Sequence, residues 1–225
     1  MFQGYSNEAF EFFMAIRFNN NRAFFQENRD WYLRAVREPS LALAQDLNAL
    51  IEEIDPEMER RPHRTLSRIN RDIRFSKDKS PYRDHVWMAF RRPGPDRGSV
   101  PGLYFQLEVE GGECGMGFYH ENRLMMDGLR ARMAQRPDEM LALLDGLKDD
   151  YSLYLDQRVR MAVPESLPEV LAPIYRARSL YFFRRIEDFE LIKSPQLADA
   201  LAADYRRLTP MYRYIMNFWP DENRL

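Results

Sequence analysis

The sequence predicts an α+β fold: a single domain over residues 1–225, with an antiparallel β-sheet of about four to six strands covered by N- and C-terminal helices. The first observation is that apolar residues recur at helical spacing near both ends of the chain. The second is that they alternate at strand spacing in its middle. The third is a glycine pair between two alternating runs, which is typical of a hairpin. The hairpin and the alternating runs exclude a four-helix bundle.

Length and composition favour one sizeable soluble domain over two small ones. The chain has 225 residues, of which 45% are apolar and 30% charged, as in ordinary globular proteins. Aromatic residues make up 13%, which argues against disorder. No apolar run reaches the roughly 20 residues that a membrane-spanning helix needs, so no membrane contact is expected.

The cysteine count and the N-terminus predict a cytoplasmic protein. Cys114 is the only cysteine, so no internal disulfide can form, which is typical of a reducing compartment. Glu8 and Glu11 interrupt the first apolar stretch and no basic leader precedes it, unlike a signal peptide.

Three helices are predicted before residue 55. Ser6 is the expected N-cap of the first, and the asparagines at 19–21 end it and cap the second. The second is expected to end by Pro39. The expected apolar faces of the three are Phe10, Phe13 and Met14; Phe24, Phe25, Tyr32 and Val36; and Leu43, Leu47, Leu50, Ile51 and Ile54.

Two strands are predicted between residues 66 and 90. From 66 to 75 the residues alternate, with Ile69, Ile73 and Phe75 on the core side. Arg71 would share that side, so either the strand ends near Asn70, which we prefer, or Arg71 is partly buried and paired. Residues 76–83 are expected to form an ordered loop. Val86, Met88 and Phe90 alternate as the next strand, and residues 92–99 form an exposed loop.

A hairpin with a two-residue turn at Gly111–Gly112 is the strongest local prediction. In that register Val109, Leu107 and Phe105 pair with Cys114, Met116 and Phe118 on the apolar face. The other face sets Glu108 opposite Gly115 and Gln106 opposite Gly117. Glycine there permits close approach either of a ligand or of another backbone segment, and both alternatives stay open.

The last hundred residues are predicted to be mostly helical. Asn122 is the expected cap of one helix, Pro137 begins another, and Ser194-Pro195 begins the last. Residues 180–186 form the expected further strand. The expected inward residues of the three helices are Leu124, Leu129 and Met133; Met140, Leu141, Leu144 and Leu147; and Leu197, Leu201, Tyr205, Leu208, Tyr212 and Ile215.

Positive charge is concentrated in residues 60–92, which hold eleven Lys/Arg against three Asp/Glu, a balance of +8. The whole chain is −2, so the remainder carries −10. With a pI near 6.0, duplex DNA is not the expected partner, although a local patch can bind one or two phosphates.

Within this window the sequence offers cations and the groups that could orient them. The candidate anion-binding residues are Arg68, Arg71, Arg74, Lys77, Lys79 and Arg83. The candidate orienting or acid–base residues are Asp72, Asp78 and Tyr82, and the candidate site floor is Gln106, Glu108, Gly115 and Gly117. Three interpretations stay open: solvated charge, an Arg–Asp network that is purely structural, and a functional anion site.

Other classes of site lack their signatures. The three histidines are not paired at metal-ligand spacing and there is one cysteine, so no metal site is expected. Neither a P-loop nor a dinucleotide fingerprint occurs, and no serine sits in a nucleophile elbow, so no cofactor is expected.

The stretch from Arg71 to Tyr82 resembles the signature of the family called domain of unknown function 2461. Residues 20–25 (NNRAFF, numbered from Asn20) are similar to that family's asparagine-pair and aromatic motif, and residues 115–119 to its glycine-containing strand. Arg83 stands where the family usually has lysine, and residues 159–181 depart more from its pattern. The resemblance implies a soluble single domain of mixed helix and sheet, and no activity.

The best functional hypothesis is therefore an anion-binding domain for a small molecule that bears phosphate or carboxylate, with the question of enzymatic activity open. The alternatives are a nucleic-acid-binding module, and a structural or protein-interaction scaffold in which the charged motif is a structural network. The sequence predicts no oligomeric state.

Overall fold

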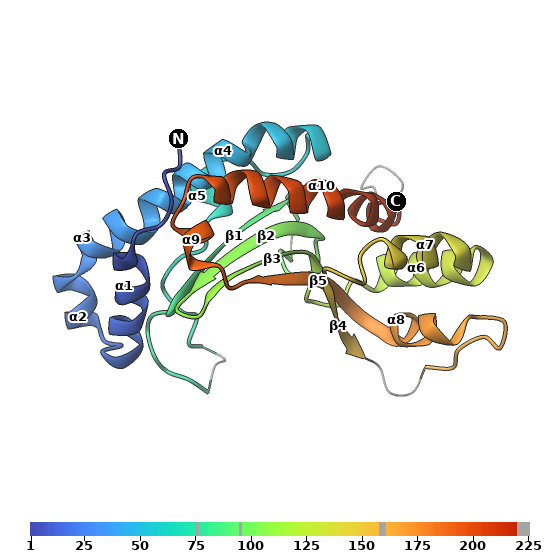
Figure 1. Ribbon diagram of the computed structural model, residues 1–225. Helices are drawn as coiled ribbons and strands as arrows, with labels where there is room; N and C mark the ends of the chain where they lie inside the picture. The colour runs from blue at the N-terminus through green and yellow to red at the C-terminus, as the bar shows by residue number, and fades with distance from the viewer. Residues whose placement is uncertain (75–76, 95, 158–160, 220–225) are drawn as a thin grey trace. The chain divides into compact units, whose positions relative to one another are not determined.

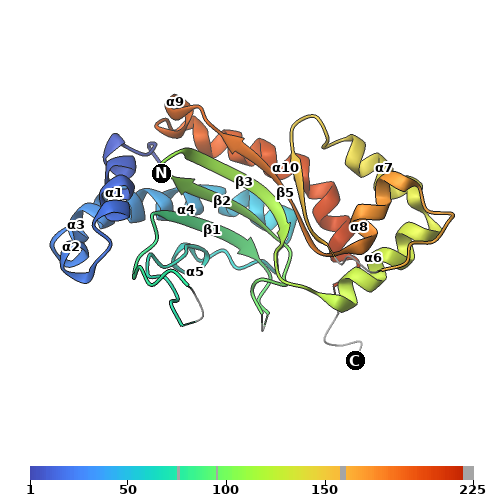
Figure 2. The same cartoon turned by 90° about the horizontal axis from the view of Figure 1, so that it is seen from below.

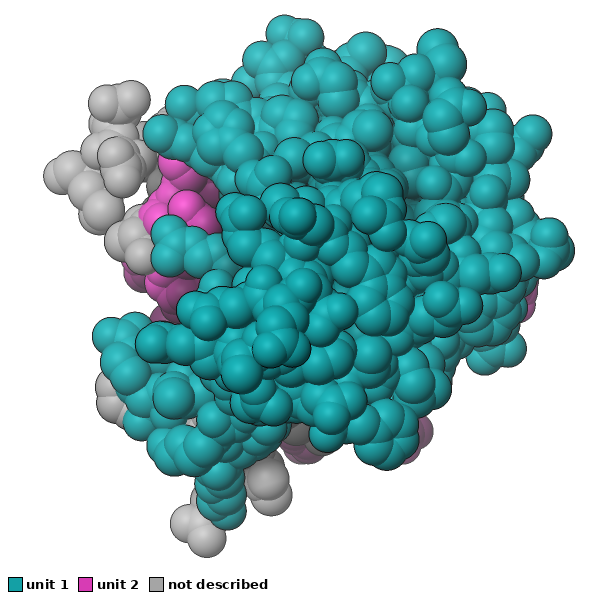
Figure 3. All heavy atoms as spheres, turned by 90° about the vertical axis from the view of Figure 1, so that its left-hand side faces the viewer, with its two compact units in different colours: residues 1–90, 104–114, 185–203 teal, residues 91–103, 115–184, 204–225 magenta. Residues whose placement is uncertain are grey.

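The computed structural model describes residues 1–74, 77–94, 96–157 and 161–219. It forms two compact units. The first comprises residues 1–90, 104–114 and 185–203, and the second comprises residues 91–103, 115–184 and 204–225. Figure 3 shows the surface of the first unit.

A five-stranded antiparallel sheet with the order β1-β2-β3-β5-β4 confirms the α+β class and the expected number of strands. The strands are β1 (His85–Arg91), β2 (Gly102–Glu108), β3 (Gly111–Phe118), β4 (Ser152–Gln157) and β5 (Ala177–Ile186). β4 was not predicted. It pairs antiparallel with β5, with Tyr154 opposite Tyr181.

Helices make up most of the rest of both units. The first unit contains α1 (Asn7–Phe18), α2 (Arg22–Glu27), α3 (Arg29–Tyr32), the π-helix η1 (Leu33–Arg37), α4 (Glu38–Ile54), α5 (Pro62–Thr65) and α9 (Phe189–Ile192). The second contains α6 (Arg123–Gln135), α7 (Pro137–Asp145), the 3₁₀ turn η2 (Glu169–Leu171) and α8 (Ala172–Arg176). The last helix, α10, runs from Gln196 to Met216.

The N-terminal helices follow the prediction in part. Asn21 caps α2, because its side chain accepts a hydrogen bond from the backbone N–H of Phe24. Ser6 is the N-cap of α1 but makes no side-chain capping bond. In α1, Met14 is exposed whereas Phe13 is buried. Pro39 does not end a helix, because it occupies the first turn of α4, where its missing N–H costs nothing.

The core of the first unit lies between α4 and one face of β1 and β2 (Figure 1). The predicted stripe of α4 is buried from Leu43 to Ile54. Tyr5 joins the two layers, since its hydroxyl is 2.9 Å from that of Ser40 in α4 and its ring stacks near Phe105 of β2. The alternating residues Val86, Met88 and Phe90 of β1 are buried, as predicted.

The opposite face of β1 and β2 carries half-buried polar and aromatic side chains. They are His85, Trp87, Tyr104, Gln106 and Glu108. Figure 2 looks onto this face, with α4 behind the strands. This second face, together with the loop that precedes β1, positions the candidate site.

Two predicted strand features are wrong. Residues 66–74 form no ladder; Leu66 and Asn70 make only isolated bridges to Met88 and Tyr82. Ile73 is 38% exposed, so it does not anchor the segment, and the predicted end of this strand at Phe75 lies outside the described residues.

The hairpin turn is at Val109–Glu110, not at Gly111–Gly112, and both glycines belong to β3. The predicted register is therefore wrong. The predicted faces are right in part, because Phe105, Leu107, Cys114 and Met116 are buried whereas Gln106 and Glu108 are half-buried. Val109, predicted for the apolar face, lies in the turn, and Gly115, predicted for the other face, is buried.

The C-terminal predictions hold in part. Asn122 caps α6, and the stripe of α10 from Leu197 to Ile215 is buried. Leu124 is exposed on α6, contrary to the prediction. Of the inward residues predicted for the helix at Pro137, Met140 and Leu147 are buried, whereas Leu141 and Leu144 are half-buried.

Candidate functional site

The candidate site is built on the basic loop, defined here as the described residues 66–74 and 77–83. Its two ends lie side by side, because the N–H of Arg71 donates to the carbonyl of Pro81 and that of Arg83 to the carbonyl of Ile69. Ile69 and Tyr82 are buried and anchor this pairing. The loop is also fixed to β1, where the N–H of Ser67 donates to the carbonyl of Trp87.

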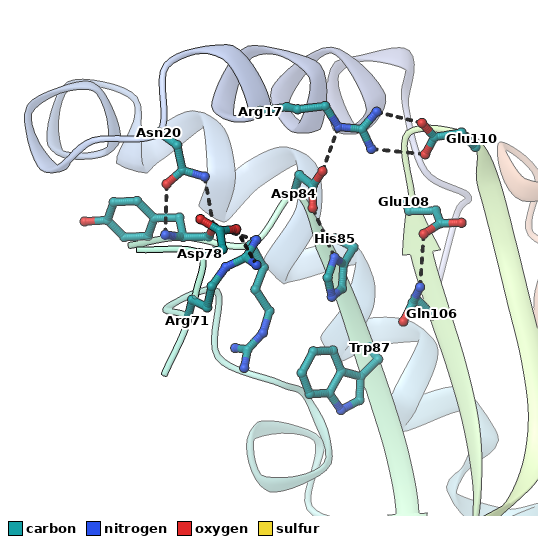
Figure 4. A network of polar contacts seen from close by, with 12 residues as sticks. Arg17, Asn20, Arg71, Asp78, Asp84, His85, Trp87, Gln106, Glu108 and Glu110 are labelled. Atoms are coloured by element: carbon teal, nitrogen blue, oxygen red, sulfur yellow. Dashed lines mark hydrogen bonds and ion pairs between the residues drawn. The ribbon is translucent and has the colours of Figure 1, made fainter. Parts of the chain in front are cut away.

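Asn20 ties the loop to the segment between α1 and α2 (Figure 4). Its amide donates to the carbonyl of Tyr82 and accepts from the N–H of the same residue, both at 2.9 Å. The ring of Phe25 stacks on that of Tyr82, with centroids 4.3 Å apart. Tyr82 is thus an anchor of the loop, and its backbone, rather than its hydroxyl, is what Asn20 contacts.

Arg71 and Asp78 form an ion pair of 2.8 Å across the loop. The side chain of Arg71 is 26% exposed, and its guanidinium also reaches the carbonyl of Tyr82 at 3.5 Å. Of the two alternatives for this position, the second holds, because Arg71 is partly buried and paired. The first, a strand that ends near Asn70, is wrong, because Asn70 makes only an isolated bridge. Hydrogen bonds from Ser80, and the charge of Arg71, lower the pKa of Asp78.

Two more of the predicted cations have partners within the loop. Arg74 forms an exposed pair with Asp72 and lowers the pKa of that carboxyl to about 2. Arg83 donates through Nη1 to the carbonyls of Arg68 and Asn70, and its guanidinium lies 4.6 Å from the centre of the Trp87 ring. These two arginines shape the loop.

Three predicted cations have no carboxylate partner among the described residues. Arg68 and Lys77 are exposed, and no described side chain pairs with either. Lys79 is also exposed, and its amine donates to the carbonyl of Ile73 at 2.8 Å. A carbonyl holds the ammonium group in place but leaves its positive charge uncompensated.

Gln106 and Glu108 were predicted as floor residues. Figure 4 shows them on β2, on the same face of the sheet as His85 and Trp87 of β1. The amide of Gln106 donates to Glu108 at 3.1 Å, and Glu108 pairs with Arg185 at 2.8 Å. The same arginine lies 3.7 Å from Glu113, which accepts from the hydroxyl of Tyr104. Both carboxylates are therefore engaged by protein groups.

The predicted floor glycines do not need a ligand to explain them. Gly117 has φ +149°, and a Cβ there would overlap the backbone of Leu180 and Tyr181 in β5. The close approach is that of a neighbouring strand, which is the second of the two alternatives considered. Gly115 is buried in β3.

A network of charged side chains beside the loop, made up of Arg17, Asp84 and Glu110 and called the relay below, was not predicted. Arg17 of α1 donates from Nε to Asp84 at 2.6 Å and from Nη1 and Nη2 to Glu110 at 2.6 and 3.1 Å. The second oxygen of Asp84 lies 3.2 Å from Nδ1 of His85. The sequence signal was the adjacent pair Asp84-His85 at the start of a strand, but the distant Arg17 and Glu110 gave none.

The relay sets the protonation of its members. Burial alone would raise the pKa of Asp84, but the hydrogen bonds from Arg17 and His85 outweigh it, so that pKa is lowered. Arg17 lowers the pKa of Glu110, and its bonds to Glu110 and Asp84 raise its own. Asp84 is therefore a carboxylate near neutral pH.

Residues 8–214 match the family described as conserved hypothetical protein (DUF2461). The chain belongs to this family. Two of the three segments that resemble its motifs, residues 20–25 and the stretch that ends at Tyr82, meet in the structure where Asn20 and Phe25 contact Tyr82. No curated protein matches the chain.

Two kinds of feature are not found in the described residues of this DUF2461 member. Within residues 1–74, 77–94, 96–157 and 161–219, no group of three or more His, Cys, Asp or Glu side chains is arranged to hold a metal ion. Over the same ranges, no helix is long and apolar enough to cross a membrane.

Proposed function

We propose that this DUF2461 protein binds a small molecule bearing a phosphate or carboxylate group at the basic loop. The observation that carries the proposal is the state of Lys79, whose exposed ammonium is held by the carbonyl of Ile73 and by no described carboxylate. Arg68 and Lys77 on the same loop are likewise exposed and without a described partner. Such cations are the groups that contact phosphate and carboxylate oxygens.

The loop supports this function because contacts among its described residues already fix the backbone around the cations. The Arg71–Asp78 pair, the two carbonyl bonds of Arg83 and the Asn20–Tyr82 bonds all hold the backbone that carries the cations. A ligand then spends less of its binding free energy on ordering the loop, which favours affinity.

The structural-scaffold alternative has its own support in the same contacts. Arg71, Arg74 and Arg83 are all bound within the loop, as a purely structural network requires. We therefore assign Arg71 and Arg83 to the frame and Lys79, Arg68 and Lys77 to the ligand.

The single domain over residues 1–225 and the cytoplasmic location stay predictions.

Thermal melting with and without inorganic phosphate tests the proposal. Phosphate should raise the melting temperature of the parent protein, because a ligand that binds only the folded state stabilises it. Lys79→Met should reduce that rise. Lys148→Met is the matched control, because Lys148 is an exposed lysine that pairs with Asp145 in the second unit. If phosphate leaves the parent unchanged, or if both variants lose the effect equally, the basic loop is not the anion site.

A further inference from the structure

Asp84 and His85 have the geometry of a general base and the carboxylate that orients it. Nδ1 of His85 lies 3.2 Å from Oδ1 of Asp84, and their side chains are 27% and 24% exposed. A carboxylate at Nδ1 favours the neutral tautomer whose proton is on Nδ1. Nε2 is then without a proton and can accept one.

The orienting carboxylate is itself held from two further segments. Nε of Arg17 in α1 donates to the other oxygen of Asp84 at 2.6 Å. Nη1 and Nη2 of the same arginine donate to the two oxygens of Glu110 in the β2–β3 turn (Figure 4). Charge-assisted bonds of this kind fix geometry more strongly than neutral ones. The relay thus positions His85 through a partner that has little freedom to move.

The surroundings of His85 suit a proton acceptor. The ring of Trp87 stacks beside it, with centroids 5.7 Å apart. Oδ1 of Asp84, 3.2 Å from Nδ1, would accept a hydrogen bond from the imidazolium once it forms.

His85 is also continuous with the basic loop. Arg83 ends the loop and places its guanidinium 4.6 Å from the centre of the Trp87 ring, whose other neighbour is His85. Ser67, near the other end of the loop, is bonded to Trp87 through both backbone and hydroxyl. The end of the loop that carries Arg68, next to Ser67, therefore adjoins the His85–Trp87 pair, and a small molecule held by Arg68 would be within reach of this imidazole.

We propose that His85 transfers a proton to or from the small anionic molecule bound at the basic loop, with Asp84 as its positioning residue; this rests on the proposed function. The Nε2 lone pair takes the proton of a substrate hydroxyl or of water, so an O–H bond breaks, an N–H bond forms, and the oxygen keeps the electron pair. The imidazolium then returns the proton to the product or to solvent. The step changes no oxidation state.

His120 provides an internal comparison. Its Nδ1 lies 2.9 Å from both oxygens of Asp96, so it also has a carboxylate partner. It is in the second unit and is 55% exposed, twice as much as His85. It therefore has the pair chemistry of His85 without the relay.

Two chromogenic esters test the inference: neutral 4-nitrophenyl acetate, and the 4-nitrophenyl monoester of succinate, which carries a carboxylate. His85 should take a proton from a water molecule while the oxygen of that water attacks the ester carbonyl and 4-nitrophenolate leaves. His85→Asn, whose side-chain amide keeps a donor towards Asp84, should lower both rates at least about tenfold. The rate that remains is the background hydrolysis by the exposed histidines. His120→Asn should change them less than about twofold. Asp84→Asn should lower the rates and shift neutral His85 towards the tautomer protonated on Nε2 in ¹⁵N NMR, because the amide oxygen would stay on Arg17 and the NH₂ group would face Nδ1.

The outcomes separate this inference from the proposed function. A parent protein that prefers the succinate ester, with a preference reduced in Lys79→Met, supports both. Equal rates with the two esters, together with a loss in His85→Asn, would contradict the anion site and support His85. Equal rates in His85→Asn and His120→Asn would overturn the inference. So would ¹⁵N NMR of the parent protein, independent of any variant, if neutral His85 carried its proton on Nε2.

Discussion

Arg71 and Lys79 lie on one loop and differ in how their charges are balanced. Arg71 has a carboxylate partner in Asp78, whereas Lys79 has a neutral carbonyl. Asp78 is 49% exposed, so water stabilises it if its partner is removed. Loss of Arg71 should therefore cost less than the roughly 3–5 kcal/mol typical of a broken buried pair. Arg71 is therefore assigned to the frame of the loop, and Lys79 to the ligand.

Asp84 links the stability of the protein to pH. Its pKa is lower in the folded than in the unfolded chain, so its stabilisation is fully present above the unfolded value of about 3.9 and is lost as the pH falls through the folded value. In Asp84→Asn, the part of the acid-induced loss of stability that comes from this carboxylate should disappear. Urea unfolding at pH 5, 4 and 3 (about one unit either side of that value) measures it. Identical pH slopes in parent and variant would show that the relay contributes nothing.

At the scale of elements, the β2–β3 hairpin shows why glycine misled the sequence analysis. The pair Gly111–Gly112 matched a turn, but Gly111 begins β3 with φ +129°, where a Cβ would press on the carbonyl of Ile186. Glycine serves tight turns and close strand packing equally well. Only the partner strand decides between them, and a single sequence does not show it.

Gly117 makes this distinction testable. Gly117→Ala should destabilise the protein by at least about 2 kcal/mol, because it forces a strained φ and overlaps the β5 backbone. Gly146→Ala is the matched control, since Gly146 has an ordinary φ of −68° and its Cβ would meet only ordinary contacts. The free energy of unfolding in urea measures both. A loss of similar size in the control would contradict the close-packing explanation.

The elements that the sequence predicted well carry their own periodic signal. The stripes of α4 and α10 and the alternation of β1 are buried as expected, because tertiary packing agrees with local pattern there. The segment at 66–74 alternates equally well but forms only two bridges, since Arg71 turns to Asp78 rather than to the core. In the candidate site, the loop cations could be predicted, whereas the Arg17–Asp84–Glu110 relay joins segments that no local pattern relates.

At the scale of the whole molecule, the charge distribution predicts weak nucleic-acid binding. Residues 60–92 carry a net charge of +8 and the rest of the chain carries −10, so a long polyanion would be repelled as well as attracted. Titration of single-stranded and duplex oligonucleotides at about 0.15 M salt should give no tight complex. Tight, sequence-specific binding would instead favour the nucleic-acid module.

The most direct test of the anion site is a phosphate titration of the ¹⁵N-labelled protein followed by amide chemical shifts. If the basic loop binds the anion, saturable shifts should concentrate at Arg68 and in residues 77–79, and Lys79→Met should weaken them. Shifts that are absent from the loop, or that rise linearly without saturation over the whole surface, would contradict the anion site.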